Sequence, residues 1–221
     1  MDATDSLPPL TAAEARTLGC LIEKEATTPD VYPLTVAAVQ AAANQKTARE
    51  PMMALELGAT NHALRQLEGK GLARQVFSSR AERYEHRMAA HFGLPSQQVA
   101  LLGLLLLRGP QTPSELMSRS ERLYRFTDLD EVKHQLDRMV RRQPALVVSV
   151  ARGAGQREDR VAHLLCGPVD ASTITVREPA NAGDFAAPAL VERVSALEAD
   201  VADLRQQIEQ LLDATKGHAT T

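Results

Sequence analysis

The sequence predicts an α+β protein, mainly α-helical with small β-hairpins, made of two similar units and a separate C-terminal helix. Three observations indicate this architecture. Short motifs recur along the chain about 75 residues apart. Each copy carries the same order of helix and strand signals. Near the C-terminus, apolar residues are spaced as they are in a coiled coil.

The internal repeat rests on three pairs of matching segments, which occur in the same order in both copies. The clearest pair shares the spacing R-x-x-R-x-x-H, and its two members are 77 positions apart. The second pair has the same offset, and the third has an offset of 84. The pairs are Arg80 to His86 with Arg157 to His163, Pro33 to Thr35 with Pro110 to Thr112, and Leu18 to Ile22 with Leu102 to Leu106.

In the first unit, local signals predict three helices followed by a β-hairpin. Thr11 and Glu14 have the spacing of a capping box, which starts the first helix. Thr35 is placed to cap the second helix, and glycines end the third. The expected helices run from Thr11 to about Glu25, from Val36 to about Gln45 and from about Ala59 to Gly69, and the strands cover 72–77 and 81–87.

The second unit repeats this order. Its most specific signal is Thr112-Pro113-Ser114-Glu115, which combines an N-cap, a proline at the first helical position and a capping-box glutamate. We expect Ser96 to cap a helix that runs to Leu107, further helices to start at Pro113 and Asp128, and strands at 145–150 and 160–165. Three helices and a hairpin, twice over, are typical of tandem winged-helix domains, which we place at residues 1–90 and 91–167.

Beyond these units, residues 168–189 contain several prolines, a glycine and little apolar periodicity, and they are expected to form a linker. Residues 190–213 are predicted to form a coiled-coil helix. Leucines at d and β-branched residues at a favour a parallel two-stranded coil, hence a homodimer. The alternative is an amphipathic helix packed on the winged helices of its own chain. The seam is Leu190, Val194, Leu197, Val201, Leu204, Ile208 and Leu211.

Charge is distributed unevenly along the chain. The net charge of −3 argues against a uniformly basic nucleic-acid coat, and an aromatic content of 3% argues against stacking on single strands. Residues 1–90 carry −1, residues 91–167 carry +3 and residues 168–221 carry −5. The N-terminus is acidic, and the longest apolar stretch, Val99 to Leu107, is too short to span a bilayer. We therefore expect a cytoplasmic protein.

Several longer strings together resemble the YceH family, uncharacterised bacterial proteins built as two winged-helix domains. The resemblance covers roughly residues 10–167 and implies the fold, but brings no catalytic or ligand residues. Ala48 and Ala43 depart from it, since the family usually has Asn and Cys there. The matching strings are Leu18 to Glu25, Thr27 to Pro29, Tyr32 to Leu34, Asn44 to Thr47, Arg49 to Pro51, Tyr84 to Arg87, Leu106 to Pro113 and Arg160 to Leu165.

The candidate DNA-binding residues lie on the third helix and the hairpin of each unit. A winged helix places its third helix in the major groove, where arginine reads guanine and asparagine or glutamine reads adenine. The alternative is a solvated polar surface whose charges pair with one another. The candidates are Thr60, Asn61, Arg65 and Gln66 on the outward side of the first unit's helix, Arg74, Arg80, Arg83 and Arg87 on its hairpin, and Lys133 and Arg138 in the second unit.

No pattern of residues predicts catalysis or metal binding. Cys20 and Cys166 lie in apolar runs without a CxxC spacing and are expected to be buried thiols. His86 and His163 are expected to be hydrogen-bonded structural residues rather than zinc ligands. The polar segment 44–50 is expected to be either structural or a contact site. We therefore predict neither an enzyme nor a metal or cofactor.

These patterns lead to two hypotheses of different classes. The first is a homodimeric protein that binds double-stranded DNA as a transcriptional regulator or chromosome-associated factor. The second is a non-enzymatic scaffold whose winged-helix surfaces bind another protein without touching DNA. Neither hypothesis involves a membrane.

Overall fold

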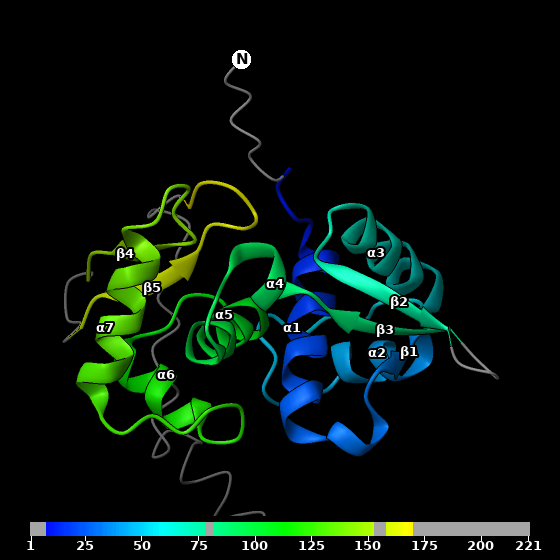
Figure 1. Cartoon of the computed structure of the whole chain (residues 1–221), viewed down its shortest axis with the longest axis horizontal. Helices are drawn as coiled ribbons and strands as arrows, with labels where there is room; N and C mark the ends of the chain where they lie inside the picture. The colour runs from blue at the N-terminus through cyan, green and yellow to red at the C-terminus, as the bar shows by residue number, and fades with distance from the viewer. Residues whose placement is uncertain (1–7, 78–81, 153–157, 170–221) are drawn as a thin grey trace, which may run out of the picture. The chain divides into compact units, whose positions relative to one another are not determined.

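The computed structural model describes residues 8–77, 82–152 and 158–169, all of which belong to one compact unit, 1–174 (Figure 1). The linker and the heptad residues of 190–211 lie outside the described residues, as does Arg80. Helices and small antiparallel sheets confirm the predicted α+β class.

The first half of the described unit, residues 12–86, contains three α-helices, a 3-10 helix and a three-stranded antiparallel sheet. In the sheet, β3 lies between β1 and β2. A capping box formed by Thr11 and Glu14 starts α1, as the sequence predicts, and Thr35 caps α2. The elements are α1 (Ala12–Thr27), η1 (Pro29–Val31), β1 (Leu34–Thr35), α2 (Val36–Ala43), α3 (Leu57–Gly69), β2 (Ala73–Phe77) and β3 (Glu82–His86).

The short helix α4 (Met88–Phe92) leads into the second half, residues 96–163. The capping box of Thr112 and Glu115 starts α6, and Asp128 caps α7. Ser96 was expected to cap α5, but Pro95 occupies the N-cap position and Ser96 is the first helical residue. The elements are α5 (Ser96–Arg108), α6 (Pro113–Ser120), α7 (Leu129–Val140), β4 (Val147–Val150) and β5 (Arg160–His163).

The two halves share strand register as well as element order. Leu34 of β1 pairs with Tyr84 of β3, and Gln111 forms an isolated bridge with Val161 of β5. Both members of the second pair lie 77 positions after those of the first. The repeat seen in the sequence is therefore also a repeat of structure.

The halves are joined through a close crossing of α1 and α5, which lie side by side (Figure 1). A methyl group added at Gly19 would lie 3.1 Å from Cβ of Leu106, and one added at Gly103 would lie 3.3 Å from Cβ of Ile22 and 2.7 Å from its Cγ2. Only glycine allows the two backbones to approach this closely.

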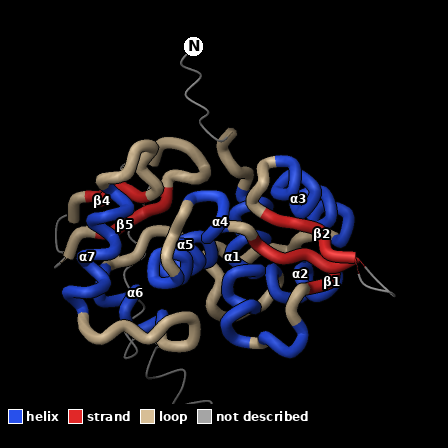
Figure 2. The backbone as a smooth tube through the Cα atoms, in the orientation of Figure 1, coloured by secondary structure: helices blue, strands red, loops and turns tan. Residues whose placement is uncertain are grey.

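One hydrophobic core runs through both halves and is centred on this helix pair, with one β-hairpin on either side (Figure 2). Helix α3 packs against α1, and α7 packs against α5. Full burial of one leucine side chain in this core contributes about 1.5–3 kcal/mol to the free energy of folding. Core residues include Leu21, Leu64 and Leu67 from the first half and Leu101, Leu105 and Met139 from the second.

Candidate nucleic-acid interface

Helix α3 has one buried face and one exposed face. Thr60, expected on the outward side, is instead 0% exposed, and its hydroxyl donates to the Glu56 carbonyl at 3.0 Å. The expectation was wrong because Thr60 lies one helical turn before Leu64, on the same core-facing stripe. The outward face carries Arg65 and Gln66, whose side chains form no hydrogen bond or ion pair with other described residues.

Asn61 lies between these two faces and is half-buried. Its Oδ1 atom is buried and has no hydrogen-bond partner among the described residues. A buried polar oxygen without a partner costs free energy, so this amide is a candidate for binding a donor group brought by a ligand.

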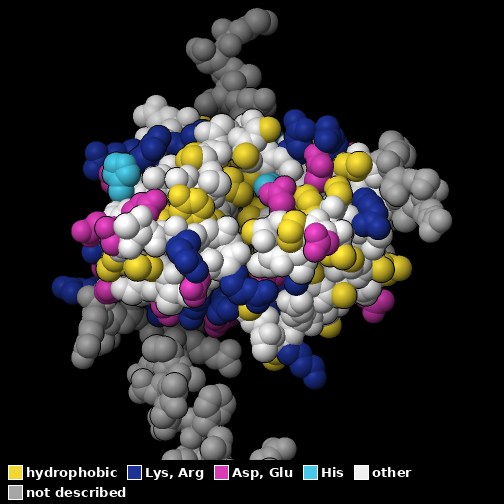
Figure 3. Space-filling view, turned by 60° about the horizontal axis from the view of Figure 1, so that its bottom comes forward, with side chains coloured by type: hydrophobic (Ala, Val, Ile, Leu, Met, Phe, Trp, Pro, Cys, Tyr) yellow, Lys and Arg dark blue, Asp and Glu magenta, His cyan; other side chains and the backbone are white. Residues whose placement is uncertain are grey.

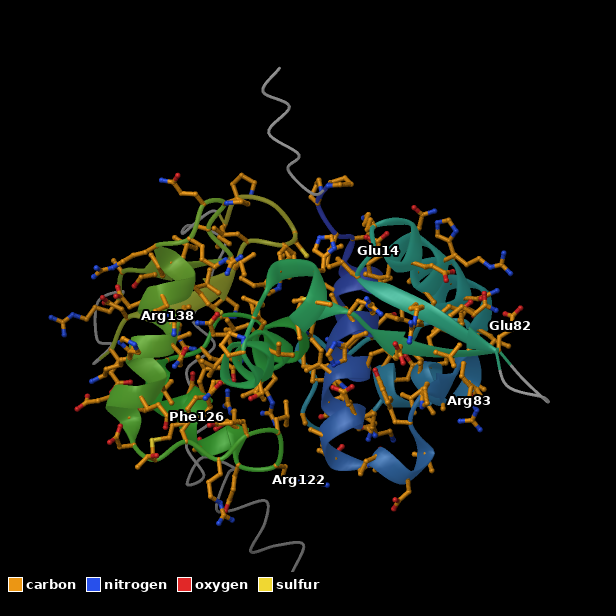
Figure 4. All side chains as sticks on the ribbon, viewed as in Figure 1. Glu14, Glu82, Arg83, Arg122, Phe126 and Arg138 are labelled. Atoms are coloured by element: carbon orange, nitrogen blue, oxygen red, sulfur yellow. The ribbon has the colours of Figure 1, made fainter. Side chains whose placement is uncertain are left out.

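On the hairpin, two of the three candidate arginines that the structure describes already have partners within the fold. Arg74 forms an ion pair with Glu85 at 2.7 Å. Arg83 donates from Nη1 to the carbonyl oxygens of Val31 and Pro33, at 3.2 and 2.7 Å. Figure 4 shows Arg83 beside Glu82, where β3 begins. Arg87 is half-buried, and no hydrogen bond from its guanidinium to the described residues is present.

Helix α7 presents a more mixed surface. Lys133 lies 3.9 Å from Asp130, and Arg141 forms an ion pair with Asp137 at 3.0 Å. Arg138 is exposed and has no ion pair or hydrogen bond with described residues (Figure 4). Arg138 is therefore the candidate on α7 that is free to meet an anion.

The face shown in Figure 3 is not a basic patch of one sign. Figure 3 shows lysine and arginine side chains interspersed with acidic and apolar ones on the face it presents. Surface pairs of this kind contribute little to stability, and their charges partly cancel at a distance. Any contact with a polyanion must therefore depend on particular side chains rather than on overall charge.

The second arginine of each R-x-x-R-x-x-H motif has a structural role. Arg160 donates from Nη1 to the carbonyl oxygen of Pro110 at 3.1 Å, which repeats the bond from Arg83 to Pro33. Arg160 also contacts Oε2 of Glu115 at 3.1 Å. These bonds hold the last strand of each half to the proline that lies two residues before the N-cap of its second helix.

The histidines of the two motifs have different surroundings. His86 lies 2.8 Å from Glu25 through Nε2, and its Nδ1 accepts from the Met88 amide at 3.3 Å, so it is hydrogen-bonded as expected. This bond from His86 lowers the pKa of Glu25. Nδ1 of His163 is buried without a partner among the described residues, and burial lowers the pKa of His163 to about 4.

The connection between α2 and α3 is fixed by a buried ion pair that the sequence pattern did not reveal. The side chain of Arg49 is 0% exposed and contacts both carboxylate oxygens of Glu23, at 3.0 and 2.5 Å. Arg49 also donates to the Ala42 carbonyl at 2.9 Å, near the end of α2. Arg49 lies in the connection after α2, outside the periodic apolar pattern of any helix or strand. The sequence pattern therefore gives no indication of this role, which only the folded chain reveals.

Further bonds hold the same connection in place. Asn44 exchanges two hydrogen bonds with the backbone of Leu55, at 2.7 and 2.9 Å. Arg16 donates to the Ala43 and Pro51 carbonyls at 3.2 and 2.6 Å. Between the two alternatives for segment 44–50, these contacts support the structural role.

Two apolar side chains project from this rigid connection. Met52 is 72% exposed, and Leu57, the first residue of α3, is 50% exposed. Exposed large apolar side chains are more typical of protein-binding surfaces than of DNA-binding ones.

The thiols show no sign of nucleophilic activation. Cys20 is 0% exposed, and burial raises its pKa to about 11, so the thiol stays protonated at neutral pH. Cys166 was expected to be buried but is exposed, because it follows the last strand in the turn at residues 164–167. Within the described ranges, no group of three or more His, Cys, Asp or Glu side chains is placed to hold a metal ion. In the same part of the chain, no helix is long and apolar enough to cross a membrane.

The fold and this surface define an α+β protein of two repeated halves with a polar third helix exposed on each. The protein-family model described as "Protein of unknown function, DUF480" matches residues 10–156. The chain is also similar over most of its length to proteins named UPF0502, and it belongs to this DUF480/UPF0502 family. Membership agrees with the YceH resemblance of the sequence.

Three relatives illustrate the similarity. A UPF0502 protein of Stenotrophomonas maltophilia is 58% identical over 211 residues, covering 94% of this chain and 96% of the relative. One from Xanthomonas oryzae pv. oryzae is 56% identical over 216 residues, with 96% of both chains covered. One from Mesorhizobium japonicum is 53% identical over 208 residues, covering 94% of this chain and 99% of the relative.

Proposed function

We propose that this protein is a non-enzymatic factor that binds double-stranded DNA, and that its two halves are winged-helix domains. The observation that carries the proposal is the repeated order of elements, three helices followed by a hairpin, with an exposed polar face on the third helix of each copy. In winged-helix proteins this helix enters the major groove. A role in regulating transcription or organising the chromosome follows from such binding.

The side chains that support base contact are fewer than the sequence suggested. Arg65 and Gln66 are exposed on α3, and their side chains form no hydrogen bond or ion pair with other described residues. They can pair with guanine and adenine respectively. Arg87 is suited to phosphate contact and Arg138, on the exposed face of α7, to contact with guanine, because neither is engaged by an acid among the described residues. Lys133 can join them by leaving Asp130, since an exposed pair at 3.9 Å is weak.

Selection from a random duplex library, at low and moderate salt, tests the proposal. The full chain should enrich a sequence motif, and its affinity should fall as salt rises because bound phosphates release counterions. Arg65→Ala should relax the preference at one or two positions. Arg125→Ala is the charge-matched control, since Arg125 is 82% exposed and lies outside α3 and α7. Failure to retain any duplex at low salt would refute DNA binding.

Homodimerisation through residues 190–211 is part of the same proposal and rests on the heptad spacing of the sequence alone. Deletion of residues 190–212 should halve the mass measured by light scattering. A seam-breaking pair, Val201→Asp with Leu204→Asp, should do the same in the full-length chain. An unchanged mass in both variants would exclude the coiled-coil dimer.

A protein-binding scaffold is the second candidate, and the exposure of Met52 and Leu57 favours it. Replacing both by serine should abolish partner binding while leaving stability within about 0.5 kcal/mol, because neither side chain is in the core. A partner captured by the full chain and lost in this variant, together with no DNA binding, would establish the scaffold instead.

A further inference from the structure

The crossing of α1 and α5 is reciprocal. In the repeat, Gly19 corresponds to Gly103 and Ile22 corresponds to Leu106, both at an offset of 84. Gly19 faces both Leu107 and Leu106, since a Cβ added at Gly19 would lie 2.9 Å from Cγ of Leu107 and 3.1 Å from Cβ of Leu106. Gly103 faces Ile22, since a Cβ added there would lie 3.3 Å from Cβ of Ile22. Each glycine thus contacts the residue that corresponds, in the repeat, to the one that the other glycine contacts.

Reciprocal contacts of this kind define an isologous interface, in which a two-fold axis exchanges the two surfaces. A head-to-tail arrangement of the halves would instead bring two different surfaces together, and a contact between two positions would not recur with the halves exchanged. The two halves of this one chain therefore pack as the subunits of a symmetric dimer do.

The third helices follow the same symmetry. Helix α3 packs on α1 and α7 packs on α5. Their buried positions have the same spacing at an offset of 72, being Thr60, Ala63, Leu64 and Leu67 in α3 and Val132, Gln135, Leu136 and Met139 in α7. Helices α3 and α7 thus occupy corresponding places, each packed through the same stripe on one helix of the crossing.

The positions of the two helices outside the buried stripe, aligned in the same way, differ in chemistry. Asn61 of α3 corresponds to Lys133 of α7, and Gln66 corresponds to Arg138. Arg65, a cation, corresponds to Asp137, an anion. The helices are thus symmetric in position but not in the base edges they can recognise.

We propose that one chain binds a DNA site made of two unlike half-sites in inverted orientation, α3 contacting one and α7 the other. This rests on the proposed DNA binding and adds the form of the target. Proteins with two-fold symmetry bind inverted repeats because the axis of the protein coincides with a dyad of the duplex. Since the glycine crossing fixes the two halves, a single spacing between the half-sites is expected.

The test uses the full chain and the motif enriched from a random library. The expected motif has two inverted halves of different sequence at one spacing. Arg65→Ala should relax one half only, and Arg138→Ala the other half only. Inserting five base pairs between the halves turns one half to the opposite side of the duplex and should weaken binding by tenfold or more, whereas a sequence change outside the motif should not.

Three results would overturn the inference while leaving DNA binding intact. They are a motif with a single half, two halves in direct orientation, and relaxation of both halves by Arg65→Ala, which is expected if α3 from two separate chains reads the site. Absence of any retained duplex at low salt would instead overturn the proposed function, and with it this inference. Both variants change exposed side chains, and matching circular dichroism spectra would exclude unfolding.

Discussion

Arg160 donates from Nη1 to the carbonyl oxygen of Pro110 at 3.1 Å, and 77 positions earlier Arg83 does the same to Pro33 at 2.7 Å. Each proline lies two residues before the threonine that caps the following helix. The repeated motif is therefore a clamp between the last strand and the second helix of each half. This structural role explains the recurrence of its second arginine without any contact to a ligand.

Replacing Arg160 by Met should lower the free energy of unfolding by about 1–3 kcal/mol, because a charged hydrogen bond to Pro110 and the contact with Glu115 are lost. Urea denaturation measures the change. Arg138→Met is the matched control, and it should stay within about 0.5 kcal/mol because Arg138 is exposed and has no described partner. Equal effects of the two substitutions would contradict the clamp.

Gly103→Ala should destabilise the protein by about 1–3 kcal/mol, because the new methyl group would lie 2.7 Å from Cγ2 of Ile22. The gain in helix propensity, up to about 1 kcal/mol, does not offset this overlap. Gly58→Ala in α3 is the control and should stabilise slightly, because nothing lies within 4 Å of its added Cβ. Thermal unfolding of both variants decides the matter, and a stabilised Gly103→Ala would exclude the close crossing.

Glu23→Gln should cost about 3 kcal/mol or more, because it leaves the fully buried guanidinium of Arg49 without a counter-charge. The same substitution at Glu121 should cost about 0.5 kcal/mol or less, since the Glu121 and Arg125 side chains are both exposed and lie 3.6 Å apart. Urea denaturation compares the two. Similar costs would show that the Arg49 pair does not hold the α2 to α3 connection.

His163 should make stability depend on pH in acid. Burial lowers the pKa of His163 to about 4 in the folded state, below the ordinary value of 6.5. The unfolded chain then binds more protons between these values, so stability is complete above pH 6.5 and falls as the pH drops toward 4. The difference amounts to about 3 kcal/mol at most, at about 1.4 kcal/mol for each pKa unit.

Urea denaturation of wild type and His163→Leu between pH 7 and pH 4 isolates this contribution. The difference in free energy of unfolding between the two proteins should shift in favour of the variant as the pH falls. A difference that stays constant over this range would show that His163 does not resist protonation.

Features with local signals could be read from the sequence. The capping boxes at Thr11 and Thr112 start α1 and α6 where the spacing indicates, and the offset of 77 is also the offset between the strand pairings of the two halves. The observed helix ends differ from the predicted ones by a few residues. These features depend on neighbours in sequence, and for this reason they were accessible.

Features that depend on distant residues were not accessible in the same way. The buried pair of Glu23 and Arg49 joins residues 26 positions apart and has no periodic signature. The strings around Gly19 and Gly103 were visible as a repeat, but only the folded chain shows that they contact each other. Thr60 was misplaced because a polar side chain at a core position satisfies its hydroxyl within its own helix.

Cys20 lies with Ala42, Ala43 and Leu107 in a small core where α1, α2 and α5 meet. Because Cys20 is buried and Cys166 is exposed, the reactivity of Cys20 reports transient opening of this small core between the halves. In a pulse of alkylating reagent, the native protein should be labelled at Cys166 first, and Cys20 should react only during moments when the small core opens. The labelling rate of one native cysteine thus gives the free energy of that opening, without any probe being engineered into the chain.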